Sequence, residues 1–334
     1  MSKDNSPQKI GFFLYDTFCE VTIYDKGDFK NILDNVKCIA ESVQDMLNIY
    51  DGDSELSKLN KNYIAGKPYK ISDELYNYLT IINKMSVLSD GKFDSTIAPV
   101  VKLWDFTSDN PRIPSDKEIE VELKKVGYQF LEYDISQKSV KFLKPHMQID
   151  AGGSGKGYAV DKVIKYLKTQ RIKSATVNFG GNLYVHGKLK VDEEHERSWK
   201  VGIQDPWNKR GISFGNVSIT DSGLATSAAY DRYFAIDNEI YHHLINPITG
   251  YPVQNDTLSV TIITPSAFVC DILSTTFFIV EDKDIEKIAK QIRQYIPLDF
   301  VIVKKEEKII ISESLKEKFA LNEDSIYSLE VIKC

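Results

Sequence analysis

Hydrophobic residues recur along this chain with two different spacings. Between residues 28 and 49 they lie three or four positions apart, as at Ile32, Val36 and Ile39, which predicts an amphipathic helix. Residues 10–24 form instead a short run rich in β-branched and aromatic side chains, which predicts one or two strands. The chain therefore combines both kinds of element from its beginning.

The same two patterns predict the remaining elements. Helices are expected at residues 72–88, 115–126, from 158 onward, 267–280, 283–294 and 313–319, and strands at 128–134, 139–143, 174–179, 182–187, 198–204, 213–219, 230–236, 240–245, 257–263, 299–304 and 307–312. Residues 51–60 are polar and turn-forming. Because helices and strands follow one another without a strict βαβ order, we expect an α+β fold with mixed or antiparallel sheets and packed helices.

No linker rich in Gly, Ser or Pro divides the chain. We therefore expect a single domain over residues 10–334, preceded by a disordered segment at residues 1–9. The 334 residues carry 42 Lys+Arg against 48 Asp+Glu and are 42% hydrophobic, which is not the composition of a disordered chain. A net charge of -6 without a basic run argues against nucleic acid or an anionic membrane as the partner.

The apolar segments are too short to span a membrane. Residues 268–280 are interrupted by Asp271, and no stretch reaches the roughly 20 apolar residues that a spanning helix needs. The N-terminus shows no apolar core of a signal peptide. The cysteines are scattered, which predicts reduced thiols: Cys19, Cys38, Cys270 and Cys334. We expect a cytoplasmic protein, with an extracytoplasmic protein or lipoprotein whose leader was removed as the alternative.

A glycine cluster, IDAGGSGKGYAVD, occupies residues 149–161. It fails the phosphate-loop pattern, since Asp150 stands where the first glycine belongs and Gly157 follows Lys156 in place of Ser or Thr. It fails the dinucleotide fingerprint as well, since Tyr158 occupies the third glycine position. The cluster still opens onto a helix whose free N–H groups, with Lys156, can bind an anion. A tight turn with a solvated lysine is the structural alternative.

Two further segments carry candidate polar groups. Asp271 and Thr275 are four residues apart, so in a helix their oxygens share one face and suit Mg²⁺. An Asp near the start of the helix and a Thr bonded to a backbone carbonyl are the structural alternative. His242 and His243 are adjacent and point to opposite faces of a strand, so only one can enter a given site. Asp94 is either a helix cap or a ligand contact.

Several segments together resemble the ApbE family of FAD:protein FMN transferases, in family order from about residue 12 to residue 280. They are DSELSKLN at 53–60, GKFDSTIAPVVKLW at 91–104, IDAGGSGKGYAVDKV at 149–163, VNFGGNLYVHG at 177–187, VGIQDP at 201–206, ATSAAYDRYF at 225–234, YHHLINPITGYPV at 241–253 and CDILSTTFFIV at 270–280.

The resemblance implies a T-fold-like α+β architecture that binds Mg²⁺ and uses FAD as its substrate. The family moves the FMN half of FAD onto a Thr or Ser hydroxyl of an acceptor flavoprotein and releases AMP. Carried over by position, the metal ligands are the Gly155 carbonyl, Asp271 and Thr275, and the site histidine is His243. The flavin-nucleotide contacts are Tyr50, which would stack on adenine, and Phe93, Asp94, Gly152, Gly153, Lys156 and Ile245.

The chain departs from the family pattern at three places. Tyr15-Asp16 stands where the family has Met-Gly, Asn246 replaces an Asp, and Ser154-Gly155 stands where Ile-Ala is commoner. Two functions are alternatives to the FMN transferase. The first is a Mg²⁺-dependent FAD pyrophosphatase, in which water replaces the acceptor hydroxyl. The second is a flavin-binding protein without catalytic activity.

Overall fold

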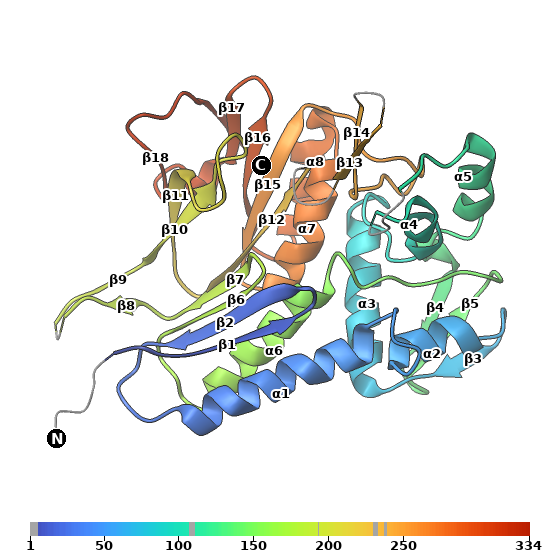
Figure 1. Cartoon of the computed structure of the whole chain (residues 1–334), viewed down its shortest axis with the longest axis horizontal. Coiled ribbons are helices and arrows are strands. Elements are labelled where there is room, and N and C mark those ends of the chain that lie inside the picture. The colour runs from blue at the N-terminus through green and yellow to red at the C-terminus, as the bar shows by residue number, and fades with distance from the viewer. Residues whose placement is uncertain (1–5, 107–110, 193, 230–232, 237–238) are drawn as a thin grey trace.

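A computed structural model of the chain describes residues 6–106, 111–192, 194–229, 233–236 and 239–334 (Figure 1). The predicted disordered segment 1–9 is only partly covered, because residues 1–5 lie outside the described residues. Within the described part, Gln8 and Lys9 already belong to the first strand, β1. Residues 230–232 of the strand predicted at 230–236 also lie outside the described residues.

A nine-stranded mixed sheet runs through the centre of the described chain. In spatial order its strands are β1 Gln8–Leu14, β2 Thr17–Ile23, β6 Ala175–Phe179, β7 Asn182–His186, β12 Ser222–Ala228, β15 Thr257–Thr264, β16 Asp299–Lys304, β17 Lys308–Ser312 and β19 Ser328–Ile332. Neighbouring strands are antiparallel up to β17, and β19 is parallel to β17.

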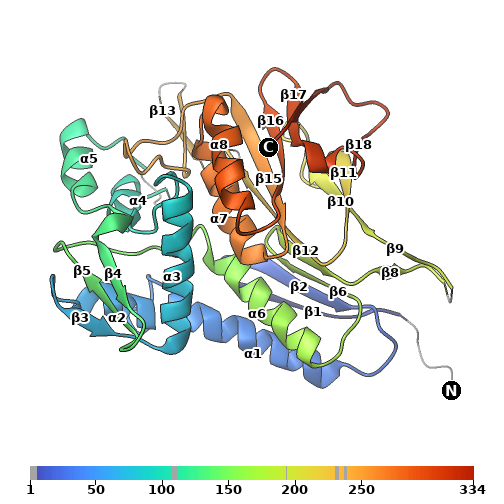
Figure 2. The ribbon, with the colours of Figure 1, turned by 180° about the vertical axis from the view of Figure 1, so that it is seen from behind.

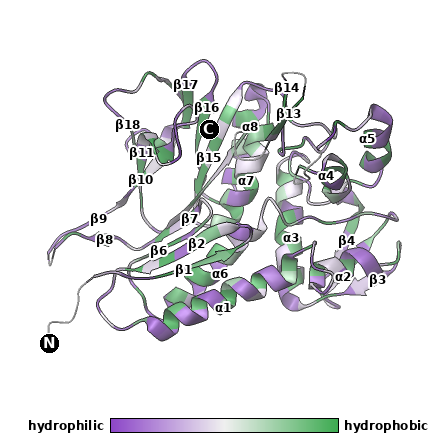
Figure 3. Cartoon of the chain, in the orientation of Figure 1, coloured by the Kyte–Doolittle hydropathy of each residue, from purple (hydrophilic) through white to green (hydrophobic). Residues whose placement is uncertain are grey.

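Four helices cover one face of this sheet (Figure 2). They are α1 Lys30–Leu47, α6 Gly155–Thr169, α7 Ala267–Ile279 and α8 Asp282–Arg293. Helix α1 is amphipathic: it buries Leu33, Val36 and Val43, and Figure 3 shows hydrophilic and hydrophobic residues along its length. Helix α7 differs, because nearly all of its residues are buried. It therefore lies in the interior between the sheet and the other helices.

The opposite face of the sheet packs against a second, three-stranded sheet. This sheet consists of β10 Trp199–Gln204, β11 Ser213–Ile219 and β18 Phe319–Leu321, and the short pair β8 Leu189–Lys190 and β9 Glu196–Arg197 extends from it. Successive residues of β15 point to opposite faces. Ile262 belongs to the core under the helices, whereas Ile263 packs in a separate apolar cluster with Val217 of the small sheet.

A mostly helical region lies beside the sheet and contributes part of the candidate site (Figure 1). Its elements are α2 Glu55–Asn62, β3 Pro68–Lys70, α3 Asp73–Leu88, α4 Ala98–Trp104, α5 Asp116–Leu123, the 3₁₀ turn η1 Tyr128–Phe130, β4 Leu131–Asp134, β5 Ser139–Phe142, and the hairpin of β13 Tyr233–Ile236 and β14 Glu239–His242. The hairpin is held by aromatic rings: Trp104 of α4 lies 5.8 Å from Tyr241 and 6.4 Å from Phe234, measured between ring centroids.

The α+β prediction is confirmed, and several element predictions need correction. Residues 51–60 contain α2, because Ser54 caps that helix and Leu56 and Leu59 bury its inner face. Strand β12 was missed, because its small residues carry no strong strand pattern. The helix predicted at 313–319 is one 3₁₀ turn, η2 Glu313–Leu315, before β18. None of the described helices combines the length and apolarity needed to cross a membrane.

Candidate active site

The glycine cluster forms the turn that leads into α6. The helix begins at Gly155, three residues earlier than the sequence pattern predicts. Asp150 fixes the turn, because its carboxylate accepts a hydrogen bond of 2.7 Å from the Gly152 N–H. Ser154, fully buried, shares a 2.6 Å hydrogen bond with the hydroxyl of Tyr78 on α3. These side-chain bonds hold the first turn of α6 in place and leave Gly152 exposed at its end.

The start of α6 lies unusually close to α7. A Cβ atom added at Gly157 would be 2.3 Å from the carbonyl oxygen of Ala267 and 2.8 Å from the Cβ of Asp271. Only glycine therefore permits this approach. The close contact lets the Gly157 N–H donate a 2.9 Å hydrogen bond to Oδ2 of Asp271. The glycine cluster thus fixes one oxygen of a candidate metal ligand.

Asp161, one turn further along α6, caps the start of α7. Its carboxylate accepts hydrogen bonds from the backbone N–H of Ala267 at 2.8 Å and from the Ser266 hydroxyl at 2.5 Å. Burial raises the pKa of Asp161, and these hydrogen bonds partly oppose that effect. Asp161 was not among the predicted site residues. Its position at the end of the GKGYAVD segment was the available signal.

Asp271 and Thr275 lie on one face of α7, as the four-residue spacing predicts. Asp271 is 7% exposed, and among the described residues its carboxylate accepts a hydrogen bond from the Gly157 N–H. The Thr275 hydroxyl is 3.7 Å from the position that a Cβ of Gly153 would occupy. A side chain at Gly153 would thus fill the space beside Thr275, which the glycine leaves open.

The candidate metal ligands are one carboxylate, one hydroxyl and one backbone carbonyl. This set suits Mg²⁺ and does not suit a metal ion that needs several charged side chains. Within the described residues, no group of three or more His, Cys, Asp or Glu side chains could hold a metal ion. Mg²⁺ is commonly bound by one or two carboxylates and keeps waters or substrate phosphates as its other ligands. The carbonyl of Gly155, at the first residue of α6, has a second lone pair beyond its helical hydrogen bond.

Phe93 and Asp94 lie in the loop before α4. A Cβ at Gly153 would be 3.5 Å from the Phe93 ring, so this ring borders the glycine turn. The Asp94 carboxylate is buried and engaged within its own loop: Oδ1 accepts from the N–H and hydroxyl of Thr96, at 2.8 and 2.6 Å, and Oδ2 from the Tyr128 N–H at 2.8 Å. Burial raises its pKa. Asp94 therefore shapes the loop that carries Phe93.

Two turns of the large sheet and the end of strand β12 lie at the end of the sheet where the candidate site lies. The β1–β2 turn, Tyr15-Asp16, lies beside the β6–β7 turn, since a Cβ at Gly180 would be 2.5 Å from Thr17. At the neighbouring strand, Ser227 of β12 contacts α7. Tyr15 replaces the family's Met, and its hydroxyl donates to the Ala40 carbonyl of α1 at 2.5 Å. Its side chain is thus directed to α1.

Tyr50 and Lys156 lie at the edges of the site. Tyr50 is 77% exposed in the turn after α1, and Leu47 at the end of α1 is 3.6 Å from the position of a Cβ at Gly155. The end of α1 therefore lies against the start of α6, with Tyr50 open to solvent nearby. Lys156 is half-buried. Burial raises the pKa of Asp150, and the charge of Lys156 is one of the smaller effects that oppose this rise.

The structure distinguishes the two histidines. His242 is buried at the end of β14, its ring lies 5.5 Å from that of Phe278, and burial lowers its pKa. His243, the predicted site histidine, is half-exposed. Because Phe278 follows Thr275 by about one helical turn, His242 lies near the face of α7 that carries the candidate metal ligands. Ile245, a predicted nucleotide contact, packs its side chain into the apolar cluster around Trp104.

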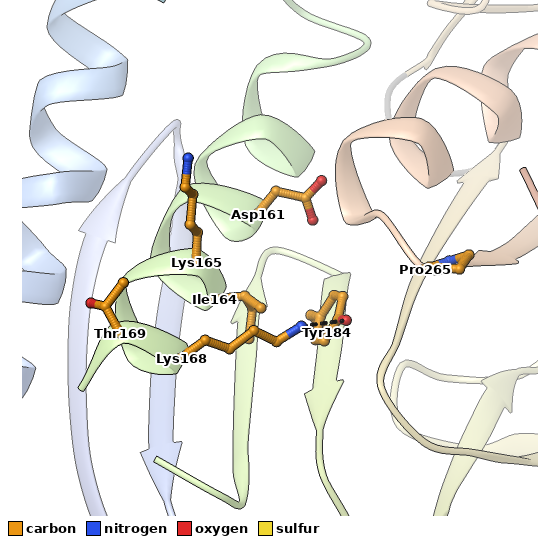
Figure 4. A pocket seen from close by; sticks show the side chains of 7 residues that line it. All are labelled: Asp161, Ile164, Lys165, Lys168, Thr169, Tyr184 and Pro265. Atoms are coloured by element: carbon orange, nitrogen blue, oxygen red, sulfur yellow. Dashed lines mark hydrogen bonds between the residues drawn. The ribbon is translucent and has the colours of Figure 1, made fainter. Parts of the chain in front are cut away.

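A shallow groove of about 480 Å³ lies elsewhere, along the second half of α6 (Figure 4). Asp161, Ile164, Lys165, Lys168, Thr169, Tyr184 and Pro265 line it. It contains none of the predicted site residues. The candidate site lies instead where the start of α6, helix α7 and the end of strand β12 contact one another.

Sequence comparison places the chain in a known family. Residues 15–298 match the family model described as "ApbE family". A protein of Klebsiella pneumoniae named FAD:protein FMN transferase is 30% identical over 278 residues, covering 83% of each chain. One of the same name from Treponema pallidum is 27% identical over 314 residues, covering 90% of this chain and 86% of the relative.

Solved structures show the same architecture. The ApbE protein of Thermotoga maritima superimposes with a TM-score of 0.82 at 29% identity, covering 94% of this chain and 99% of that one. The flavin transferase ApbE of Vibrio cholerae superimposes with a TM-score of 0.80 at 23% identity, covering 94% and 100%. The chain belongs to the ApbE family. The predictions of this family, of an α+β fold and of a transferase enzyme are confirmed.

Proposed function

We propose that this protein is a Mg²⁺-dependent FAD:protein FMN transferase, which attaches FMN to a Thr or Ser hydroxyl of an acceptor flavoprotein and releases AMP. The observation that carries the proposal is the contact between α6 and α7. This contact brings the Asp271 carboxylate and the Thr275 hydroxyl of α7 against the open N-terminal turn of α6. The 2.9 Å hydrogen bond from Gly157 to Asp271 joins the two helices. The names of the family relatives support the same activity.

Two groups of residues bind the metal ion and the phosphates. Asp271, Thr275 and the Gly155 carbonyl would hold Mg²⁺. The bound ion would neutralise the negative charge of the FAD pyrophosphate. The backbone of Gly152 and Gly153, with the Lys156 ammonium, contacts the phosphates at a helix N-terminus. These groups orient the phosphorus for in-line attack.

The remaining residues bind the two ends of FAD and handle the proton. Tyr50 stacks on the adenine. Phe93 borders the flavin side on a loop that Asp94 holds, and Ile245 contributes a further contact to the flavin nucleotide. His243 accepts the proton of the acceptor hydroxyl. A phosphorus–oxygen bond forms to the acceptor, the pyrophosphate bond breaks, and AMP leaves with the electron pair of that bond.

The decisive experiment incubates the protein with FAD, Mg²⁺ and a candidate acceptor flavoprotein. We expect the acceptor to gain the mass of a covalently attached FMN, and we expect AMP to appear in equal amount. AMP that appears without any acceptor would indicate the pyrophosphatase, and bound FAD without AMP would indicate a binding protein. Either result would replace the proposed function.

Asp271→Ala tests the metal assignment within that assay. Removing the carboxylate should lower FMN transfer by at least about 100-fold, since a metal-ion contribution to the transition state is worth several kcal/mol. Asp73→Ala is the matched control, because Asp73 is an exposed acidic residue in the first turn of α3. Full activity of Asp271→Ala in Mg²⁺ would contradict the assignment.

A further inference from the structure

Three hydroxyl groups form a chain between β12 and α7. The hydroxyl of Ser227 on β12 lies 2.8 Å from that of Ser274 and 3.4 Å from that of Thr275, both on α7. Ser274 also donates a 2.9 Å hydrogen bond to the backbone carbonyl of Asp271. Ser274 is buried, and Ser227 and Thr275 are half-buried.

The direction of each hydrogen bond follows from counting protons, since each hydroxyl has only one to donate. Ser274 donates its proton to the Asp271 carbonyl, because a carbonyl oxygen can only accept a hydrogen bond. The Ser227–Ser274 bond must then use the proton of Ser227. The Ser227–Thr275 contact is left with the proton of Thr275. The chain therefore runs from Thr275 to Ser227, to Ser274 and to the Asp271 carbonyl.

Thr275 differs in this respect from its neighbour. A helical Thr commonly donates to the carbonyl four residues earlier, as Thr276 does to Ile272 at 2.9 Å. For Thr275 that carbonyl belongs to Asp271, and it already accepts from Ser274. Among the described residues, the Thr275 hydroxyl instead contacts the hydroxyl of Ser227.

We propose that Ser227 is a positioning residue that orients the Thr275 hydroxyl for metal binding. With its proton turned to Ser227, Thr275 presents lone pairs to the space that Gly153 leaves open. A cation needs a lone pair and repels a proton, so this orientation is the productive one. The 3.4 Å contact is long for a hydrogen bond. It shortens on metal binding, because a cation makes the bound hydroxyl a stronger donor.

This inference rests on the proposed function, which supplies the metal. It adds Ser227 and Ser274 to the site. The sequence showed ATS at 225–227 without indicating which residue matters. In the structure, Thr226 points to the other side of the strand and shares a 2.8 Å hydrogen bond with Thr261. Ser227 is thus the residue of this segment whose hydroxyl faces α7.

The test measures metal affinity directly, by titrating the whole protein with Mn²⁺ and following free Mn²⁺ by electron paramagnetic resonance. Ser227→Ala should weaken binding by about tenfold, the usual effect of losing a residue that orients a metal ligand. Ser222→Ala is the matched control on the same strand, where the hydroxyl donates to the Thr220 carbonyl. The control should bind Mn²⁺ as the parent protein does.

A double-mutant cycle with Thr275→Ala shows whether Ser227 acts through Thr275. If it does, Ser227→Ala has no further effect on Mn²⁺ affinity once Thr275 has been replaced. Unchanged affinity of Ser227→Ala in the parent background would overturn the proposal. An equal loss in both backgrounds would overturn it as well, since Ser227 would then act by packing. If the parent protein binds no Mn²⁺, the proposed metal dependence itself fails, which is a separate result.

Discussion

The close approach of α6 and α7 makes Gly157→Ala the most informative single substitution. The added Cβ would be 2.3 Å from the Ala267 carbonyl oxygen, where ordinary contact begins at 3.4 Å. The two helices must therefore separate by about 1 Å at this point. The Gly157–Asp271 hydrogen bond, now 2.9 Å, would lengthen to about 4 Å and break.

The expected cost has three parts. Overpacking costs about 1–3 kcal/mol, and the lost hydrogen bond to a buried carboxylate about 1.5–3 kcal/mol. Alanine has a better helix propensity than glycine, which offsets about 0.5–1 kcal/mol of this cost. We expect the free energy of unfolding to fall by about 3 kcal/mol, and Mn²⁺ affinity to fall with it because Asp271 loses its orienting donor.

Urea unfolding followed by circular dichroism measures the stability, and Mn²⁺ titration measures the site. Gly155→Ala is the control for stability, because its Cβ would meet Leu47 and Ala151 at the ordinary distances of 3.6 and 3.7 Å. It should leave the free energy of unfolding unchanged or raise it by up to about 1 kcal/mol. A Gly157→Ala protein as stable as Gly155→Ala would refute the reasoning.

Three further predictions concern packing, capping and pH. Trp104→Ala should lower the free energy of unfolding by about 3–5 kcal/mol in urea, against a small change for exposed Trp207→Ala; equal effects would contradict the role of the aromatic cluster. Asp161→Ala should cost about 1–2 kcal/mol, because α7 loses its cap; an unchanged urea midpoint would exclude that role. Burial lowers the pKa of His242 below its usual value, so as the pH falls through about 6.5 the unfolded chain takes up a proton first and stability decreases. His242→Gln should remove that part of the decrease between about pH 7.5 and pH 5.5, and an identical pH dependence in both proteins would contradict it.

Much of the fold could be predicted from local patterns. The 3.6-residue spacing in α1, α3 and α8 located these helices within one or two residues, because each buries one face against a core. β12 could not be found in this way. Its residues Ser222–Ala228 are mostly small, and it is a strand because β7 and β15 pair with it on either side.

The candidate site was predictable only in part. The spacing of Asp271 and Thr275 placed both oxygens on one helix face, and the structure has them so. Asp94 was a candidate ligand contact because it is polar within an apolar segment. In the structure its carboxylate accepts hydrogen bonds from Thr96 and Tyr128, and no local pattern reveals a partner 34 residues away.

The sequence by itself determined the family and the α+β class, and it supplied the candidate residues for the chemistry. Local spacing and motif order contain this information, since they depend on neighbours in the chain. Only the tertiary structure decided how those residues meet. The bond from Gly157 to Asp271 joins residues 114 apart, and that from Ser227 to Ser274 joins residues 47 apart. Such contacts depend on how the apolar faces of α6, α7 and the sheet pack, and on the absence of a Cβ at Gly157.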